Sequence, residues 1–335
     1  MFGNLRNISW QSNRTKRVAI GALILAILGT AIGFRFLTPF IFDGLVVILA
    51  WFATYEVYNA KKLDQKGVKD YFLYPYLSIA YLTFLLGILV ATPFAWWLHV
   101  VMQIVLVFAL CIYVFLMTYT DKEQIKASKM SKESMGKISM KVVKEYLKLI
   151  FYPAFLILLL IPINHMDRWA GVVIDGTMTA VTMLPLFAIL MVFIVSMLTD
   201  TAAYAVGGIL KGEKKLAPSI SPKKTWVGAI AGLFGGVLGA LLVILVMSID
   251  PTLQAYLTDR IGNADMVISV VMAVGLFGSI LTQAGDLYAS WIKRRNDTKD
   301  FGKLLPGHGG IMDRIDGAIW NTAFIFIMTL LLVFI

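Results

Sequence analysis

Charged residues and cysteines are scarce in this sequence. Only 15% of its 335 residues are charged, whereas 59% are hydrophobic and the mean hydropathy is +0.79. Because about a quarter of the residues in a soluble domain are charged, this composition excludes an ordinary soluble protein. The single cysteine, Cys111, lies in an apolar run, so a disulfide framework is excluded as well. What remains is a membrane protein that crosses the bilayer many times.

Nine stretches are long and apolar enough to cross the roughly 30 Å of hydrocarbon in a bilayer. We therefore expect an all-α fold of about nine transmembrane helices, the first of them a retained helix and not a signal peptide. Residues 1–140 would form N-terminal helices with a basic loop, and residues 141–335 a catalytic transmembrane domain. The predicted spans are residues 18–37, 40–60, 71–92, 94–117, 149–164, 173–199, 226–249, 266–286 and 313–335.

The basic residues fall almost entirely on one side of this arrangement. With the N-terminus inside, the inner segments hold 27 of the 30 Lys and Arg residues, and the outer loops hold only Arg35, Arg168 and Arg260. An excess of this kind is typical of cytoplasmic loops. It predicts a cytoplasmic N-terminus in a bacterial plasma membrane. The net charge of +10 then reflects topology and attraction to anionic membrane lipids, and no nucleic-acid partner is expected.

Four acidic residues stand at the predicted ends of spans in the second half of the chain. Asp200 and Asp286 close two spans, and Asp313 and Asp316 open the last one. Ionisable groups so close to hydrocarbon are costly, which favours a functional role. Asp313 and Asp316 are three residues apart, so on a helix they share one face and repel each other. A divalent cation such as Mg²⁺, which binds a few carboxylates together with phosphate oxygens and water, would relieve that repulsion.

Glycines and cations accompany these acids. Gly307, Gly309 and Gly310 allow backbone amides to approach an anion closely, and the helix that follows them attracts negative charge to its N-terminus. The pattern predicts a magnesium and polyphosphate site at the cytoplasmic rim of the C-terminal helices. Taken singly, the same features would also suit a flexible turn, a capped helix end and a membrane anchor. The cations expected to contact phosphate are Lys223, Lys224, Lys293, Arg294 and Lys299.

Two motifs in this region resemble those of a known family. The run from Ser290 to Asp316 contains SWIKR, KDFG and LPGHGGIMDRID, and it is similar to the long signature of phosphatidate cytidylyltransferases, also called CDP-diacylglycerol synthases. The stretch SPKKTW, residues 221–226, resembles the second motif of that family, and Asp200 with the following Ala203 and Tyr204 resembles the acidic segment before it. The resemblance is specific over about residues 199–317.

This resemblance implies that the chain converts CTP and phosphatidic acid to CDP-diacylglycerol and pyrophosphate in phospholipid biosynthesis. The metal would be Mg²⁺, with a second cation as an alternative, and the implied metal ligands are Asp200, Asp286, Asp313 and Asp316. His308 would hydrogen-bond a phosphate or pyrophosphate oxygen, and it joins Lys299, Asp286, Asp313 and Asp316 in the implied catalytic set. The implied substrate-binding residues are Ser221, Lys223, Lys224, Lys293, Arg294, Gly309, Gly310 and Arg314.

Departures from the family pattern leave alternatives open. Val227 stands where the family usually has a glutamate, and Gly317 where a serine often follows the last acid. A weakened relative that binds lipid or nucleotide without turnover is therefore one alternative. A CTP-dependent polyprenol or phytol kinase is another, and a membrane transporter is the third.

Five glycines lie along the predicted span 226–249. Small residues at such spacing let two membrane helices approach closely. We expect the neighbouring helix to belong to the same chain, because this span also carries the lysine motif that must meet the last helix. A homodimer is the alternative. The glycines are at positions 228, 232, 235, 236 and 239.

Overall fold

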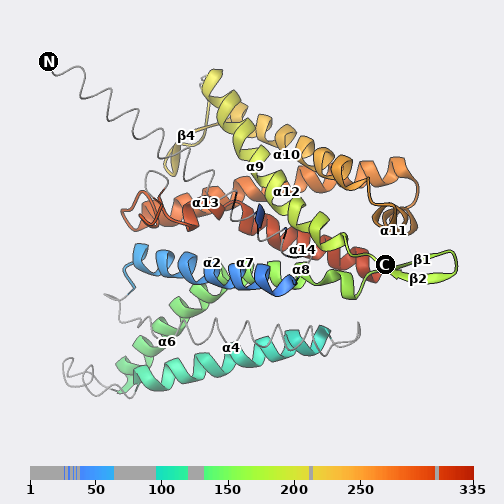
Figure 1. Cartoon of the computed structure of the whole chain (residues 1–335). Helices are drawn as coiled ribbons and strands as arrows, with labels where there is room; N and C mark the ends of the chain where they lie inside the picture. The colour runs from blue at the N-terminus through green and yellow to red at the C-terminus, as the bar shows by residue number, and fades with distance from the viewer. Residues whose placement is uncertain are drawn as a thin grey trace.

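The structure is a computed structural model that describes residues 38–63, 96–119, 132–210, 214–305 and 309–335, with single positions at 26, 29, 30, 33 and 35. This part of the chain is mostly helical and carries two short β-hairpins (Figure 1). Five helical segments are long and apolar enough to cross a membrane, which fits a multi-pass membrane protein. The predicted span 71–92 and most of the span 18–37 lie outside the described residues, so the number nine stays a prediction.

The elements follow one another along the chain as α2 Pro39–Ala60, α4 Trp96–Tyr119, α6 Lys132–Leu149, a π-helix Ile150–Phe155, α7 Leu156–Leu158, α8 Leu160–Asn164, a 3-10 turn Met166–Arg168, β1 Gly171–Ile174, β2 Thr177–Ala180, α9 Leu184–Ile209, β3 Lys215–Ala217, β4 Ser221–Thr225, α10 Trp226–Met247, α11 Pro251–Ile261, α12 Ala264–Arg295, α13 Met312–Ile315 and α14 Ala318–Phe334.

The span predicted over residues 173–199 is wrong in its first part. Strands β1 and β2 form an antiparallel hairpin in which Gly171 pairs with Ala180. The two residues of its turn, Asp175 and Gly176, have φ values of +50° and +77°, and an Asp-Gly pair favours such a left-handed turn. Helix α9 begins only at Leu184, after this hairpin.

Two helices continue past the predicted ends of their membrane spans, so the acids expected at helix ends do not lie there. Asp200 lies inside α9, which continues to Ile209, and Asp286 lies inside α12, which continues to Arg295. Nine further residues of helix extend each axis by about 13 Å. A charged residue limits the apolar stretch, but it does not end the helix, because a helix can continue into water. The two acids therefore project from the sides of helices and not from their ends.

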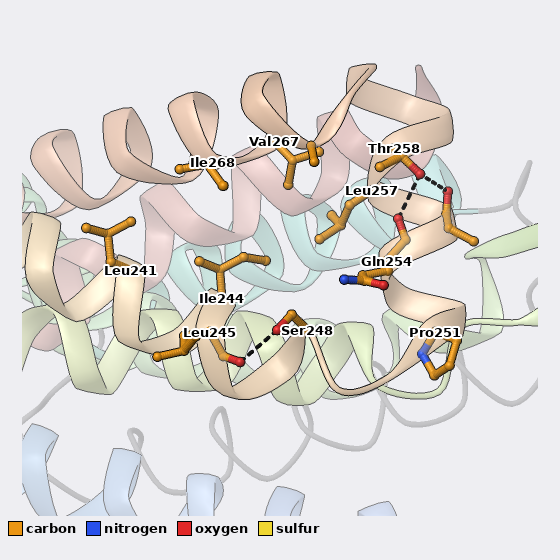
Figure 2. Close-up of a pocket in the computed structure, with 12 residues that line it drawn as sticks. Leu241, Ile244, Leu245, Ser248, Pro251, Gln254, Leu257, Thr258, Val267 and Ile268 are labelled. Atoms are coloured by element: carbon orange, nitrogen blue, oxygen red, sulfur yellow. Dashed lines mark hydrogen bonds between the residues drawn. The ribbon is translucent and has the colours of Figure 1, made fainter.

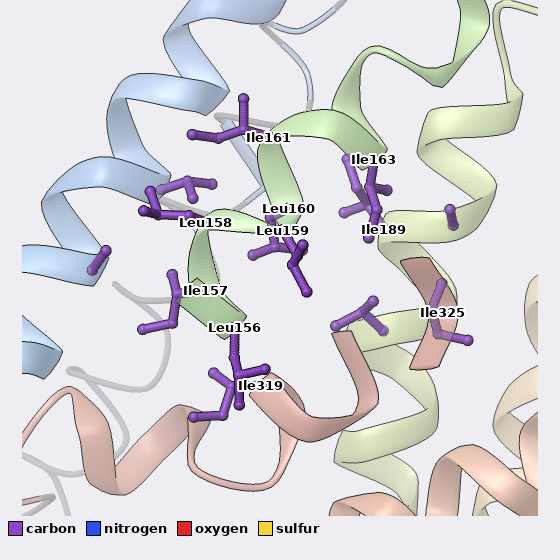
Figure 3. Close-up of a cluster of buried hydrophobic side chains, with 14 of the residues drawn as sticks. Leu156, Ile157, Leu158, Leu159, Leu160, Ile161, Ile163, Ile189, Ile319 and Ile325 are labelled. Carbon is purple, nitrogen blue, oxygen red and sulfur yellow. The ribbon is translucent and has the colours of Figure 1, made fainter. Parts of the chain in front are cut away.

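The centre of the described fold is the segment of residues 156–164, which contains α7 and α8. All of its side chains are buried. Its leucines and isoleucines pack against α2, α9 and α14, and Figure 3 shows Ile189 of α9 and Ile319 and Ile325 of α14 around it. Such complete burial is unusual for a span that faces lipid on one side. This segment therefore acts as the core around which the other helices are arranged.

The glycines of α10 contact helices of the same chain. A methyl group added at Gly236 would lie 2.4 Å from Cβ of Ser279 in α12, and one added at Gly235 would lie 2.5 Å from the Leu198 carbonyl oxygen in α9. Only a residue without a side chain fits at either position. The expected contact within one chain is confirmed, and a homodimer stays an untested alternative.

A buried polar cluster ties together the end of the bundle near β1 and β2. The Arg35 Nε donates to Asn164 Oδ1 at 2.8 Å, and Asn164 Nδ2 donates to Asp43 Oδ1 at 2.9 Å. His165 Nε2 lies 2.8 Å from Asp43 Oδ2, and Arg35 forms an ion pair of 3.3 Å with Asp167. Arg35, predicted to lie in an outer loop, is therefore a buried structural residue.

The two ends of the bundle differ in character. At one end lie the hairpin β1–β2 and α11, an 11-residue helix that the sequence reasoning did not predict. At the other end lie the hairpin β3–β4 and the segment that joins α12 to α13 (Figure 1). All the polar motifs singled out from the sequence belong to this second end or to the helices that reach it.

We predict that Gly236→Ala destabilises the protein by about 1–3 kcal/mol, because the new methyl group meets Ser279 and the Gly275 carbonyl in a packed interface. The matched control is Gly208→Ala in α9, where nothing lies within 4 Å of the added methyl group. That control should be neutral or slightly stabilising, since alanine favours a helix over glycine. Equal unfolding midpoints in a denaturant titration in detergent would contradict the close packing of α10.

Candidate active site

A buried lysine lies between the two acids at the start of the last helical region. Lys293 Nζ, near the end of α12, is 2.9 Å from Asp313 Oδ1 and 3.6 Å from Asp316 Oδ2. The three side chains are 4–12% exposed. Lys293 also lies over the ring of Phe301, with 5.0 Å between Nζ and the ring centroid. The positive charge expected between Asp313 and Asp316 is thus supplied, in part, by the protein itself.

Asp313 also holds the segment between α12 and α13. Its Oδ2 accepts hydrogen bonds of 2.9 Å from the backbone amides of Phe301 and Gly310. Both carboxylate oxygens are therefore engaged, one by Lys293 and the other by two amides. Asp313 positions the glycine-rich stretch relative to α12, whatever else it does.

Glu56, in α2, is a site residue that the sequence reasoning missed. Its carboxylate is buried and accepts hydrogen bonds from the backbone amides of Ile311, at 3.0 Å, and Met312, at 2.8 Å, where α13 begins. A methyl group at either Gly302 or Gly310 would lie 2.3 Å from this carboxylate. These two glycines therefore leave space for Glu56. An acid inside a predicted membrane span was the signal that could have revealed it.

The lysine motif meets the acid of α12. Lys224 Nζ, at the end of β4, lies 2.5 Å from Asp286 Oδ2, and both side chains are about a quarter exposed. The next residue, Thr225, caps α10 by accepting a hydrogen bond of 3.1 Å from the Gly228 amide. The cap fixes the point where the strand becomes a helix, and so it fixes the position of Lys224.

Arg294 connects the same two segments through the backbone. Its Nε donates to the carbonyl of Ile220 at 3.3 Å, and one terminal nitrogen donates to the carbonyl of Thr298 at 3.4 Å. The turn between β3 and β4 is thus held against the end of α12.

The other predicted site residues lie nearby but make fewer contacts. Ser221 begins β4 and is partly exposed, and Lys223, Lys299 and Arg314 are exposed. Gly309 has a φ of +83°, and its carbonyl accepts a hydrogen bond of 2.9 Å from the Leu305 amide. His308 lies outside the described residues. Phosphate binding by these residues stays a prediction.

The negative charges of the site exceed its positive charges. Asp200, Asp286 and Asp313 all lie near enough to Asp316 for their charges to act on it, and Lys293 is the cation that opposes them there. Four carboxylates thus face two paired lysines, Lys293 and Lys224. A bound cation would balance the difference.

The donor set fits magnesium only if other ligands complete the site. Within the described ranges, no three His, Cys, Asp or Glu side chains are grouped closely enough to hold a metal ion. Mg²⁺, however, is commonly held by one or two carboxylates plus phosphate oxygens and water. Asp200 makes no hydrogen bond or ion pair with any described residue, and Asp286 and Asp316 are only partly engaged. These three acids suit that role better than Asp313, whose part in metal binding stays a prediction.

A large apolar cavity lies away from these groups. It has a volume of about 710 Å³ between α10, α11 and α12, and its lining includes Ile244, Leu257 and Val267 (Figure 2). No charged side chain lines it. It opens at the end of α10 opposite to Lys224, so it cannot serve the charged site directly.

Comparison with known proteins agrees with the motifs. The model of a family described as "Cytidylyltransferase family" matches residues 15–332. The chain is 42% identical over 139 residues to a phosphatidate cytidylyltransferase of Brucella suis, a match that covers 42% of this chain and 45% of the relative. It is 41% identical over 143 residues to a protein of the same name from Staphylococcus epidermidis, covering 43% and 46%.

A third relative, the phosphatidate cytidylyltransferase of Rickettsia conorii, is 37% identical over 147 residues, which cover 43% of this chain and 58% of the relative. The chain therefore spans about half the length of the curated relatives that it matches.

We predict that Glu56→Gln lowers the free energy of unfolding by about 1.5–3 kcal/mol, because a neutral amide replaces a charged acceptor of two amides. The control is Glu145→Gln in α6, whose carboxylate contacts the side chains of Lys61 and Lys148 and no described backbone amide. Limited proteolysis should also cut the segment 296–311 faster in Glu56→Gln and not in Glu145→Gln. Identical cleavage in both variants would show that Glu56 does not hold α13.

Proposed function

Because the chain belongs to the cytidylyltransferase family, we propose that it transfers the cytidylyl group of CTP to phosphatidate and releases pyrophosphate. The observation that carries this proposal is the pairing of each lysine with acids at one end of the bundle, Lys224 with Asp286 and Lys293 with Asp313 and Asp316. A reaction between two phosphates needs such a mixture, since cations must hold the anions and acids must hold a metal.

In the proposed reaction a phosphate oxygen of phosphatidate attacks the α-phosphorus of CTP. A new P–O bond forms, the bond from the α-phosphorus to the oxygen that bridges to the β-phosphate breaks, and pyrophosphate leaves with the bonding electrons. The second pKa of a phosphomonoester is about 6, so the attacking oxygen is already ionised at neutral pH and no general base is required. The barrier comes mainly from bringing two anions together.

The lysines of the site would lower that barrier by offsetting the negative charge of the two substrates. Lys224 reaches the site from the β3–β4 hairpin and Lys293 from α12, so the two cations approach from different elements. Fixed positive charges in a partly dehydrated site stabilise the charge that develops on the phosphates far better than water does. Lys223, Lys299, Arg314 and Arg294 would add contacts from the exposed side, and His308 would hydrogen-bond a phosphate oxygen.

Magnesium is the proposed cofactor. Asp286 and Asp316, with Asp200, would hold it, and bound Mg²⁺ would neutralise phosphate charge and so lower the repulsion between the two substrates. A second cation remains part of the proposal. The site has four carboxylates and two lysines, so its excess negative charge could be balanced by more than one bound cation.

The valine at position 227 is compatible with this role. Val227 lies in the first turn of α10 and is 38% exposed. A glutamate there could orient a lysine, but Lys224 already has a carboxylate partner in Asp286. The missing glutamate therefore does not leave this lysine without an acid.

The alternatives gain less support from the geometry. A polyprenol or phytol kinase would have to deprotonate an alcohol, and Asp286 and Asp313 are each engaged by a lysine, which leaves Asp200 as the carboxylate for that task. A transporter would place its polar residues near the membrane midplane. Here Lys224 lies in β4, just before α10 begins, and Lys293 lies near the end of α12. A weakened relative, which binds lipid or nucleotide without turnover, would have the same site geometry. A measurement of turnover distinguishes it from an enzyme.

We predict that the purified protein incorporates labelled CTP into CDP-diacylglycerol and that Asp316→Asn lowers the rate at least 100-fold, which is about 2.7 kcal/mol of barrier. The control is Asp259→Asn on α11, at the opposite end of the bundle, which should keep the parent rate. An inactive parent at every magnesium concentration would favour the weakened relative. Full activity of Asp316→Asn at saturating Mg²⁺ would remove Asp316 from the site.

We also propose that nine helices cross the membrane with the N-terminus in the cytoplasm, so that the site faces cytosolic CTP. The 27 to 3 division of basic residues supports this arrangement. So does the described fold, in which the basic hairpin β3–β4 and the end of α12 lie together, away from β1 and β2.

We predict that Lys303→Cys, in a Cys111→Ala background, reacts with an impermeant thiol reagent only from the cytoplasmic side. The paired variant Met178→Cys, on β2, should react only from the outside, since both side chains are exposed at opposite ends of the bundle. Labelling of both cysteines in intact cells would overturn the proposed orientation.

A further inference from the structure

A second cavity, which is partly polar, lies beside the candidate active site, between α2, α6 and α12. It has a volume of about 420 Å³, within the range of small-ligand sites. We call it the α6–α12 cavity, and the lining residues that matter here are Lys61, Lys141, Glu145, Lys148, Tyr152 and Arg295. None of them is among the site residues predicted from the sequence, although Arg295 lies within the run from Ser290 to Asp316.

The α6–α12 cavity is strongly positive. Four cations and one acid line it, so its lining carries an excess of three positive charges. Glu145 is shared by Lys61, at 3.0 Å, and Lys148, at 2.5 Å. Lys141 and Arg295 form no ion pair with any acid in the described part of the chain. Arg295 lies over the ring of Trp291, 5.2 Å from its centroid, so among the described residues these two cations have no acidic partner.

A buried hydroxyl gives a second, independent indication of a polar ligand. The Tyr152 side chain lines the cavity and is only 4% exposed, yet its hydroxyl has no hydrogen-bond partner among the described residues. Leaving a buried donor unpaired is unfavourable. A ligand with several acceptor oxygens would remove that penalty.

The same tyrosine places the cavity next to the acids. Its ring meets the ring of Tyr288 at 4.8 Å between centroids, and Tyr288 stands two residues beyond Asp286 on α12. Asp316 and Asp286 also lie near enough for their charges to act on Tyr152. A phosphate bound in the cavity would thus lie beside the aromatic pair that neighbours the candidate metal ligands.

The lining also fits a ligand with an apolar part. Val57 and Ile292 join the cations, and Trp291, which is 40% exposed, stacks near Tyr288 at 5.8 Å between ring centroids. Aromatic side chains at the end of membrane helices are typical of the level of lipid headgroups. Both the polar and the apolar lining are those expected for the head of a membrane lipid.

We propose that the α6–α12 cavity binds the phosphomonoester headgroup of an anionic membrane lipid, with Lys141, Arg295 and the Tyr152 hydroxyl as its ligands. A phosphomonoester carries about 1.5 to 2 negative charges at pH 7, which matches the two unmatched cations better than the single charge of a phosphodiester. That this lipid is the phosphatidate consumed in the reaction rests on the proposed function, whereas the binding itself does not.

The test measures lipid binding by native mass spectrometry of the full-length protein in detergent, without CTP. Phosphatidate should bind at least tenfold more tightly than phosphatidylglycerol, and inorganic phosphate should compete only at millimolar concentrations. Equal binding of phosphatidylglycerol would overturn the choice of a phosphomonoester. Tight binding of inorganic phosphate would assign the cavity to free phosphate and overturn the choice of a lipid.

Variants locate the binding. Lys141→Ala and Arg295→Ala should each weaken phosphatidate binding about tenfold, because each removes one charge-assisted contact. Lys144→Ala, an exposed lysine of the same helix that does not line the cavity, is the matched control and should bind as the parent does. Unchanged binding in both Lys141→Ala and Arg295→Ala would overturn the proposal.

Tyr152→Phe keeps the ring and removes only the hydroxyl. It should weaken phosphatidate binding severalfold without lowering the unfolding midpoint, because no described residue forms a hydrogen bond with the hydroxyl. If the protein also turns over CTP, the KM for phosphatidate should rise in Lys141→Ala and Arg295→Ala while the KM for CTP stays within twofold. Binding without turnover would leave this site in place and count against the proposed function alone.

Discussion

The fold depends on one constraint, that no charge can be buried in a helical membrane protein without a partner. An isolated ionised group in an apolar interior is prohibitively costly, and removing one partner of a buried pair is strongly destabilising. Each buried charge described here is matched accordingly: Glu56 by two amides, Lys293 by two acids, and Arg35 by Asn164 and Asp167. These pairs fix where helices from distant parts of the chain can lie.

Close helix packing gives those pairs their geometry. The glycines of α10 bring its backbone against both α9 and α12, so that the strand before α10 reaches the acid on α12. Larger residues at these positions would push the helices apart and so move Lys224 away from Asp286. The arrangement of the candidate site is thus a consequence of small side chains in the middle of the helices, well away from the charged groups themselves.

Much of the candidate site could be predicted from the sequence, because its residues are concentrated in two short motifs. Lys224, Asp286, Lys293, Asp313 and Asp316 do lie together, and the contact of α10 within the chain was expected. Glu56 was missed because its partners are backbone amides, which leave no mark in a sequence. They lie more than 250 residues away.

The remaining errors have local causes. A hydropathy count sums the apolarity of the residues and takes no account of turn-forming pairs. The stretch around Asp175 and Gly176 was therefore predicted to be part of a membrane span. An Asp-Gly pair between apolar residues is, however, a strong signal for a hairpin, and a hairpin is what forms there. Hydropathy likewise ends a span at its first charge, and so it placed Asp200 and Asp286 at helix ends. Backbone hydrogen bonding, which continues past a charged side chain, decides where a helix ends.

The contact between Glu56 and α13 also determines when, during synthesis, the packing around α2 can be completed. Residues Ile311 and Met312, which donate to Glu56, are synthesised 255 and 256 residues after it. At about 5–20 residues per second, roughly 13 to 50 seconds pass while helix α2 waits in the membrane with this carboxylate unmatched. The acid must meanwhile be solvated or protonated. The early helices can therefore insert one by one, but their packing around Glu56 is completed only when the glycine-rich segment has emerged from the ribosome.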